Sequence, residues 1–353
     1  MTFAPPPFRS PVPVRVNLYS DTQTRPTRAM KAAMMDAEVG DEQHGDDPSI
    51  TALCERMAAL MGKQDAMFLP TGTMCNQIAI LGHCRPGDEI IAHHTAHILT
   101  SEGGGPGALA GAMILGLAGE DGQFTAETVR EALRPKSRYC PPQTLLAVEQ
   151  TANFGGGSVW PLDRLNEVAA VAHDNGMATH MDGARLMNAV VATGVPAAEM
   201  VANFDTVWLD FTKGLGAPLG AVLCGTSEFI GAAWRWKQRM GGALRQGGIC
   251  AAACSYALEH NIDRLADDHA NARDLARGLA QVPGLSVRMP QTNLVYIDTT
   301  ASGIDASELA ERAAQHGVLI SVMGKHRARA CTHLDVSAEQ VAEAAAVIRA
   351  IAA

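Results

Sequence analysis

The sequence lacks several features that define large classes of proteins. Its eight cysteines form no C-x-x-C pair and lie mostly in apolar segments, as is typical of reduced core residues in a cytoplasmic protein. The start of the chain has no charged segment followed by an apolar stretch and a small-residue cleavage site, so no signal peptide is predicted. No metal site is predicted either.

Long hydrophobic runs and clustered positive charge are also missing. The most apolar glycine-broken run, residues 107–119, is shorter than the ~20 residues that a bilayer requires, so no membrane association is expected. The formal charge is 28 − 37 = −9, and the basic residues are scattered rather than gathered into a stripe. Nucleic acid is therefore not an expected partner.

What the sequence does contain is a regular alternation of two patterns. From about residue 49, short apolar runs rich in β-branched residues alternate with longer helix-patterned stretches, which predicts βαβ units and a mainly parallel sheet. The predicted strands are residues 66–69, 89–92, 145–149, 177–182, 206–211 and 220–224. The predicted helices are residues 74–82, 162–175, 229–239 and 249–258.

The texture of the sequence changes towards its end. Beyond residue 259, Ala- and Arg-rich helices surround short strands at residues 285–288, 294–297 and 318–321. With 353 residues, 47% of them apolar, the chain can bury a large core and a smaller second one. We therefore expect a Pro-rich arm over residues 1–16, a large α/β domain over 17–258 and a smaller α+β domain over 259–353.

Lys213 is the most informative candidate site residue. Ligands of doubly wound sheets bind beyond the carboxyl ends of strands, and Lys213 ends an apolar strand and enters a glycine-rich turn. The other five lysines lie in polar, helix-like or loop segments. A lysine in a confined site can form a Schiff base, and the following glycines let the backbone approach a planar ligand. The alternative is a solvent-facing turn lysine, which the preceding strand disfavours.

Two other strand ends carry polar residues. Asp182 leaves a buried strand with Arg185 three positions later, so a carboxylate could pair with a protonated ring nitrogen and a guanidinium could hold a carboxylate. A structural Asp–Arg pair explains this motif equally well. At Gly72 and Thr73 a strand turns into a helix whose first N–H groups could bind phosphate, although an ordinary helix start explains that motif alone.

His97 follows the strand predicted at residues 89–92. It could stack on an aromatic cofactor or move a proton, although a lone histidine is more often a partly buried structural residue. Residues 103–108 fit G-x-G-x-x-A but follow a histidine-rich loop, which disfavours a dinucleotide site. Together these four places supply the parts that pyridoxal phosphate requires on an aspartate-aminotransferase-like sheet.

Seven motifs in series, from about residue 17 to the end, resemble the threonine aldolase family. They are Ser20-Asp-Thr-Gln-Thr-Arg-Pro26, Gly40-Asp-Glu-Gln-His-Gly-Asp-Asp-Pro48, Glu149-Gln-Thr151, His180-Met-Asp-Gly-Ala-Arg185, Thr212-Lys-Gly-Leu-Gly216, Gly241-Gly-Ala-Leu-Arg-Gln246 and Thr332-His-Leu-Asp-Val336. The resemblance implies the pyridoxal-phosphate fold of type I.

The resemblance also implies roles for individual residues. Those assigned to the cofactor are Lys213 as its Schiff-base partner, Asp182 at the pyridine nitrogen, His97 stacked on the ring, and Gly72 and Thr73 at the phosphate, with Arg245 reaching it from a neighbouring subunit. Those assigned to the substrate carboxylate are Ser20, Arg185 and Arg329. A homo-oligomer, commonly a tetramer with active sites at the subunit interface, is implied as well.

Two matched positions depart from the family pattern. His44 stands where an aromatic residue is usual, and Tyr139, ten positions before Glu149, stands where many relatives have a second histidine. Smaller changes are Thr212 for serine and Ala152 for histidine. Because a histidine is a better base than a tyrosine at neutral pH, we hypothesise that His97 or His44 assists proton removal. Tyr139 would then orient the β-substituent of the substrate.

The resemblance implies retro-aldol cleavage of L-threonine, L-allo-threonine or related β-hydroxy-α-amino acids to glycine and an aldehyde. The nearest alternative keeps the cofactor but catalyses β-elimination, racemisation or transamination. A more distant alternative is a nicotinamide-dependent dehydrogenase. Another is a catalytically inactive binding protein, which the intact Lys213 and Asp182 argue against.

Overall fold

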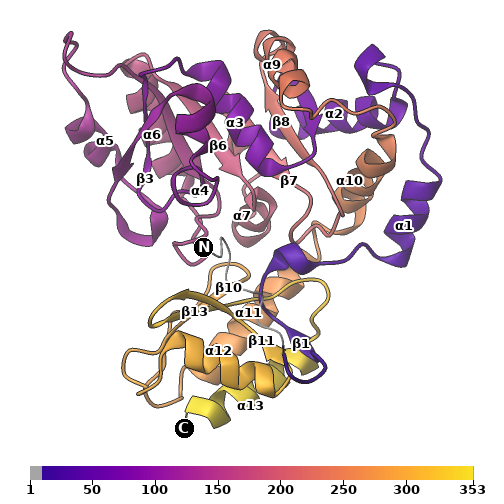
Figure 1. Cartoon of the computed structure of the whole chain (residues 1–353), viewed down its shortest axis with the longest axis vertical. Helices are drawn as coiled ribbons and strands as arrows, with labels where there is room; N and C mark the ends of the chain where they lie inside the picture. Colours follow the sequence, from indigo (N-terminus) through magenta and orange to yellow (C-terminus); the bar gives the residue numbers. More distant parts are fainter. Residues whose placement is uncertain (1–9, 353) are drawn as a thin grey trace. The chain divides into compact units, whose positions relative to one another are not determined.

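A computed structural model describes residues 10–352 and divides the chain into two compact units (Figure 1). The larger unit is Arg25–Ile262, and the smaller combines Met1–Thr24 with Asp263–Ala353. The predicted limits differ in two ways, since the predicted boundary stood at residue 258 and residues 17–24 were predicted in the larger domain. Strand β1 (Val16–Asn17) instead pairs with β11 (Val318–Leu319) of the smaller unit, a long-range pairing without a local sequence signal.

The Pro-rich arm predicted over residues 1–16 falls partly outside the described residues, which begin at residue 10. In its described part, the Ser10 hydroxyl donates a hydrogen bond to the Ala314 carbonyl at 2.7 Å. No helix within residues 10–352 is long and apolar enough to cross a membrane.

The larger unit is built on a twisted sheet whose strands are mostly parallel. Its strands are β2 (Asp65–Leu69), β3 (Glu89–His93), β4 (Met113–Leu117), β5 (Gln143–Glu149), β6 (Ala178–Gly183), β7 (Thr206–Asp210) and β8 (Ala221–Gly225). Their order is β2-β8-β7-β6-β5-β3-β4, and β8 runs antiparallel to both neighbours. The prediction of a mainly parallel sheet is therefore confirmed. Edge strand β4 was not predicted, because Gly116 interrupts its apolar run and the strand is half exposed.

The larger unit also contains helices, some packed against the sheet and others against neighbouring helices (Figure 1). They are α1 (Arg28–Met35), α2 (Pro48–Met61), α3 (Gly72–His83), α4 (His97–Thr100), α5 (Ala126–Ala132), α6 (Leu162–Asp174), α7 (Leu186–Thr193), α8 (Ala197–Met200), α9 (Ser227–Arg239) and α10 (Gly248–His260), with shorter turns η2 (Glu42–His44), η3 (Pro106–Ala110) and η4 (Glu120–Gly122). Helices α3 and α9 bury Ile78 and Ile230 against Met67 and Leu223 of the sheet. Each such side chain contributes about 1.5–3 kcal/mol, so α3 is held firmly against the strands.

The smaller unit has an antiparallel sheet covered by helices, as the α+β prediction required. Its strands are β9 (Ser286–Val287), β10 (Leu294–Asp298), β12 (Ser321–Gly324) and β13 (Arg327–Cys331), in the order β12-β13-β10-β9, and its helices are η1 (Asp21–Gln23), α11 (Leu265–Leu279), α12 (Ala306–Gln315) and α13 (Ala338–Ala352). Strand β13 was not predicted because Arg327 and Arg329 alternate with the buried Ala328 and Ala330, a pattern with little apolar content.

Candidate active site

Three neighbouring strands bring polar residues together at their carboxyl ends. In the register of the sheet, Glu149 of β5 is paired with Asp182 of β6, and Asp182 is paired with Trp208 of β7. Paired residues of parallel strands point to the same face, so these three side chains lie in a row. Carboxyl ends of parallel strands are where this class of sheet binds its ligands.

Lys213 lies in the turn that follows β7. Its Nζ is 2.8 Å from Asp210 Oδ2 and 5.8 Å from the centroid of the Trp208 ring, and its side chain is 18% exposed. The other oxygen of Asp210 accepts hydrogen bonds from the backbone N–H and the hydroxyl of Thr212, both at 2.8 Å. Asp210 therefore fixes the turn as well as the lysine, and the amine is confined beside an aromatic ring.

Asp182 is buried at the end of β6 and accepts two hydrogen bonds. Asn76 Nδ2 donates to its Oδ2 at 2.8 Å, and the backbone N–H of Ala184 donates to its Oδ1 at 3.0 Å. Burial raises the pKa of Asp182, whereas the nearby charges of His97 and Lys213 and the hydrogen bond from Asn76 lower it. A carboxylate in such a place can hold a proton on an aromatic ring nitrogen.

Asn76, in the second turn of α3, connects Asp182 to a buried chain of hydrogen bonds. Its Oδ1 accepts from Trp208 Nε1 at 2.7 Å and from His180 Nε2 at 3.0 Å. Because an indole N–H can only donate, the amide oxygen must face Trp208 and the amide NH₂ must face Asp182. Burial lowers the pKa of His180 to about 3, so His180 is neutral and its Nδ1 accepts from Thr206 Oγ1 at 2.8 Å.

His97 opens α4 and is held at two points. Its backbone N–H donates to Glu149 Oε2 at 3.1 Å, and its Nδ1 is 2.9 Å from Glu102 Oε1. The side chain is 37% exposed, while that of Glu102 is fully buried. Burial, together with the charge of Asp182, raises the pKa of Glu149 to about 7. His97 is thus an accessible imidazole with its ring and backbone fixed by carboxyl groups.

The N-terminus of α3 fits the phosphate cradle expected from the sequence. Thr71 caps the helix by accepting a hydrogen bond from Met74 N–H at 3.2 Å, while the N–H groups of Gly72 and Thr73 have no partner inside the helix. A Cβ at Gly72 would lie 2.1 Å from Trp208 Cη2, so only glycine permits this approach. Unpaired N–H groups at a helix start attract anions such as phosphate.

The donor set as a whole fits pyridoxal phosphate. It combines N–H groups for a phosphate, a confined amine for a carbonyl carbon and a buried carboxylate for a ring nitrogen. His97, Glu102 and Asp182 also present ligand atoms within 4.8 Å of one another, an arrangement that could suggest a metal ion. Asn76 Nδ2, however, donates to both Glu102 Oε1 at 2.6 Å and Asp182 Oδ2 at 2.8 Å. A cation would have to displace this amide.

His44 and Arg245 meet elsewhere in the larger unit, on Asp41, whose side chain is partly buried. His44 Nδ1 is 3.2 Å and Arg245 Nη1 is 2.8 Å from the same oxygen, Asp41 Oδ2. The side chains of His44 and Arg245 are 71% and 59% exposed. Beneath them, the fully buried Lys237 forms an ion pair with Glu42, which also accepts the backbone N–H of Leu244 at 2.8 Å. The hydrogen bond between Glu42 and Leu244 joins the two sequence motifs that carry His44 and Arg245.

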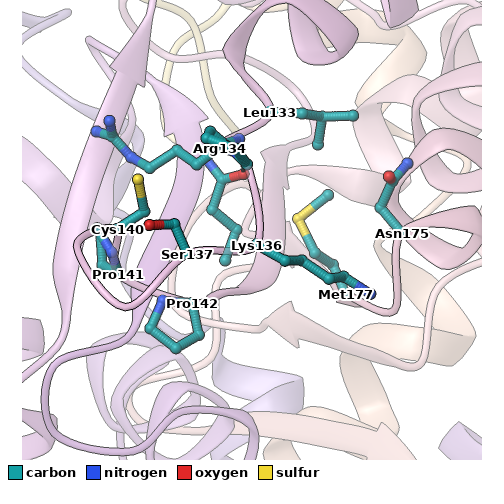
Figure 2. A pocket seen from close by; sticks show the side chains of 11 residues that line it. Leu133, Arg134, Lys136, Ser137, Cys140, Pro141, Pro142, Asn175 and Met177 are labelled. Carbon is teal, nitrogen blue, oxygen red and sulfur yellow. Dashed lines mark hydrogen bonds between the residues drawn. The ribbon is translucent and has the colours of Figure 1, made fainter.

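Tyr139 is not among the residues that gather at the carboxyl ends of the strands. It lies 86% exposed in the loop that precedes β5, at the amino end of the strand whose carboxyl end carries Glu149. Lys136 and Cys140 of the same loop line a cavity of about 350 Å³, together with Met177 from the segment before β6 (Figure 2). Because its lining residues precede β5 and β6, this cavity lies at the opposite edge of the sheet from Asp182.

The three predicted carboxylate-binding residues are divided between the units. Arg185 is buried in the larger unit just before α7, and its backbone N–H donates to the Gln150 carbonyl at 3.2 Å. Ser20 and Arg329 are buried in the smaller unit, where Arg329 Nη2 donates to the carbonyl of Tyr19 at 3.5 Å. The Ser20 hydroxyl caps η1 by accepting from Thr22 N–H at 3.2 Å.

Sequence reasoning did not assign Asn76, Glu102 or Glu149 to the site, although all three are buried and connect Asp182 with His97. A signal existed for Asn76, since it stands with Gln77 as a polar pair inside an otherwise apolar helix. Glu102 is a single acidic residue before a run of glycines, and nothing in the sequence indicates its partners.

Known proteins resemble this chain in sequence and in fold. Residues 17–302 match the beta-eliminating lyase family. The chain is 40% identical over 339 residues to the low specificity L-threonine aldolase of Escherichia coli K12, covering 96% of this chain and 99% of that protein. It is 37% identical over 333 residues to low-specificity L-threonine aldolase 1 of Arabidopsis thaliana, covering 92% and 93%.

Solved structures agree at the level of the fold. A threonine aldolase of Leishmania major has a TM-score of 0.82 at 20% identity, covering 96% of this chain and all of that one (100%). A serine palmitoyltransferase of Sphingomonas wittichii has a TM-score of 0.73 at 18% identity, covering 95% and 86%. From the near full-length identity to L-threonine aldolases, this chain belongs to the threonine aldolase family of lyases.

Proposed function

We propose that the protein cleaves L-threonine, L-allo-threonine or related β-hydroxy-α-amino acids to glycine and an aldehyde, with pyridoxal phosphate as cofactor. The observation that carries the proposal is the confinement of Lys213 Nζ beside Trp208, at the strand ends that also hold Asp182. The names of the relatives, low-specificity L-threonine aldolases, support the reaction.

When bound, pyridoxal phosphate supplies a carbonyl that condenses with amines and a ring that withdraws electrons from the carbon next to the amine. In this chain Gly72 and Thr73 would hold its phosphate with their N–H groups. Lys213 would bind its carbonyl carbon through Nζ, and Asp182 would hold a proton on the ring nitrogen. Arg245 would reach the phosphate from a neighbouring subunit.

The reaction also requires that the substrate be held in one orientation. Arg185 and Arg329 would grip the substrate carboxylate, with Ser20 beside it, so that the Cα–Cβ bond is aligned for cleavage. His97 would accept the proton of the β-hydroxyl through Nε2 as that bond breaks. The carboxylate of Asp182 keeps the site able to draw electron density away from Cα, and a proton then returns to Cα to give glycine.

His97 is favoured over His44 as the base. Its Nδ1 and backbone are held by Glu102 and Glu149, next to Asp182. His44 and Tyr139 are exposed, and His44 is bonded to Asp41. For either to act on substrate, a second subunit must bring it to a site. The exposure of His44, Tyr139 and Arg245 supports the proposal of a homo-oligomer that completes the active sites, with a tetramer as the expected form.

The purified protein tests this function directly. It should release equal amounts of glycine and aldehyde from threonine, allo-threonine, phenylserine or 3-hydroxyaspartate, without any keto-acid acceptor. It should also absorb at about 410–430 nm, where a lysine-bound pyridoxal group absorbs. Ammonia release without glycine would instead favour β-elimination, and a dependence on a keto acid would favour transamination.

The same proposal includes a cytoplasmic location. All eight cysteines are free thiols in the structure, which is the state that a reducing compartment maintains. Fractionation of the cells that produce the protein tests this, and its recovery with secreted proteins would contradict it.

A further inference from the structure

Glu102 is a buried carboxylate that holds the His97 ring, and the function proposed above assigns it no chemical role of its own. Its fully buried side chain accepts hydrogen bonds from three side chains. His97 Nδ1 lies 2.9 Å and Asn76 Nδ2 lies 2.6 Å from Oε1, and Gln77 Nε2 donates to Oε2. All four residues belong to the larger unit.

The position of Glu102 is fixed by Asn76. The indole N–H of Trp208 determines which way the Asn76 amide faces, so Nδ2 must point to the two carboxyl groups of Glu102 and Asp182. One side chain thus sets the separation between the carboxylate that holds His97 and the carboxylate of Asp182. Breaking a buried contact of this kind costs about 1–3 kcal/mol, so the arrangement is rigid.

The contact with Glu102 determines the protonation of the His97 ring. A carboxylate only accepts hydrogen bonds, so Nδ1 of a neutral His97 carries the proton and Nε2 carries the lone pair. Within residues 10–352, Nε2 has no hydrogen-bond partner. A carboxylate at Nδ1 also stabilises the imidazolium that forms when Nε2 takes up a proton.

We propose that Glu102 is a positioning residue that holds His97 with Nδ1 protonated and strengthens Nε2 as the base for the substrate hydroxyl. This inference rests on the proposed function, because only a substrate with a hydroxyl needs such a base. Asn76 donates hydrogen bonds to both Glu102 and Asp182. The base His97 and the carboxylate that would face the ring nitrogen are therefore held by one hydrogen-bond network.

The charges around His97 agree with this role. Burial lowers the pKa of His97, but the hydrogen bond to Glu102 and the charges of Asp182, Glu102 and Glu149 outweigh it, so the pKa of His97 is raised. The alternative is that Glu102 only satisfies the buried amides of Asn76 and Gln77. In that case its charge would not affect the chemistry of His97.

Glu102→Gln separates the two possibilities because the chain can accommodate it. Asn76 Nδ2 still requires an acceptor, so the new amide oxygen stays opposite Asn76 and His97. The new amide NH₂ then faces Gln77, whose Oε1 is buried without a partner in the described chain and can turn to accept it. The variant therefore keeps the hydrogen bonds and removes the charge. Glu102→Asp is the matched control, because it keeps the charge.

The first measurement uses the protein without cofactor or substrate. Nitrogen-15 NMR of labelled histidines, with the His97 signals assigned by their loss in His97→Asn, should show Nδ1–H in wild type and in Glu102→Gln, with a lower pKa of His97 in Glu102→Gln than in Glu102→Asp. His180 is an internal control, since it should show Nε2–H throughout.

The second measurement is the pH profile of cleavage by the cofactor-loaded enzyme. Since neutral His97 is the active form, Glu102→Gln should move the acidic limb to lower pH and reduce the plateau kcat about tenfold or more, with KM little changed. Glu102→Asp should keep the wild-type limb. An Nε2–H signature in wild type, or an unmoved limb in Glu102→Gln, would overturn the inference. Failure of wild type to release glycine would overturn the proposed function instead. The NMR result would still show whether Glu102 controls the protonation of His97.

Discussion

Two of the four histidine–carboxylate pairs in the larger unit differ mainly in burial. In one, His97 Nδ1 is 2.9 Å from the fully buried Glu102, which is also held by Asn76 and Gln77. In the other, His44 Nδ1 is 3.2 Å from Asp41, and both side chains are accessible to water. The chemical groups are the same, so the pairs show what the surroundings add.

The surroundings determine whether a histidine–carboxylate pair has one fixed geometry or is a variable surface contact. Around Glu102 each lost hydrogen bond leaves a buried group unsatisfied, so one geometry is strongly preferred. Around Asp41, water can replace either partner and salt screens the charges. A surface pair of this kind acquires a defined geometry only when another molecule covers it.

Loss of Lys213 should produce the largest effect, because the proposed reaction requires its amine. Lys213→Ala should abolish cleavage and the absorbance at about 410–430 nm, because no other lysine lies at the carboxyl ends of the strands in the seven-stranded sheet. Lys63→Ala is a control, since Lys63 donates to the carbonyls of Val201 and Phe204 and has no contact with the site. Borohydride labelling of a different lysine in wild type would refute the assignment.

Asp182→Asn should have the next largest effect. Both oxygens of Asp182 accept hydrogen bonds, so an amide NH₂ must face a donor and should cost about 1–3 kcal/mol of unfolding free energy. Turnover should fall further, on the order of 100-fold or more, because an electrostatic contact to the reacting system is lost. Steady-state kinetics beside denaturant unfolding separate the two effects, and near-normal turnover would exclude the role.

Glu149→Gln should change the pH dependence of stability. The pKa of Glu149 is raised to about 7 by burial and by Asp182, so above its unfolded value near 4.5 the unfolded chain loses the proton first. Wild type should therefore lose stability relative to the variant as pH rises from about 4.5 to about 7, by about 3 kcal/mol in total, since one pKa unit corresponds to about 1.4 kcal/mol. Denaturant unfolding of the cofactor-free proteins measures this, and parallel curves would contradict it.

Asp41→Asn should have the smallest effect on the isolated chain. The partners of Asp41 are exposed, so the midpoint of thermal unfolding should scarcely change, and any change should vanish in high salt. If active sites are shared between subunits, the same variant should weaken cofactor binding, because Arg245 loses its orienting partner. A large loss of stability at high salt would show that this pair resembles the buried one after all.

The sequence predicted the groups that stand at strand ends. Lys213, Asp182 and the helix start at Gly72 lie where the apolar runs of β7, β6 and β2 end, and this placement follows from the chain itself. Such polar residues interrupt the apolar run of a strand, and this interruption can be recognised in the sequence alone. The mainly parallel sheet was predictable for the same reason, because its buried strands are continuous apolar runs.

The network behind these groups could not be predicted. Asn76 joins Glu102, 26 positions away, to Asp182, 106 positions away, and neither separation has a periodic signal. The exposure of Tyr139 was equally hidden, because its spacing from Glu149 indicates family membership and not which edge of the sheet its loop occupies. Hydrogen bonds between residues far apart in the sequence depend on the folded structure and leave no pattern in the sequence.

Helix α3 carries Gly72 at its first position and Asn76 four residues later. Four residues advance a helix by about 6 Å and return to nearly the same face, so α3 sets a fixed spacing between the proposed phosphate cradle and the amide that holds Asp182 and Glu102. Inserting or deleting one residue in this turn would rotate Asn76 by about 100° and break every contact that it makes. Homologous enzymes should therefore vary in side chains between these two positions but not in the number of residues, and an alignment gap there would mark a protein that has lost this chemistry.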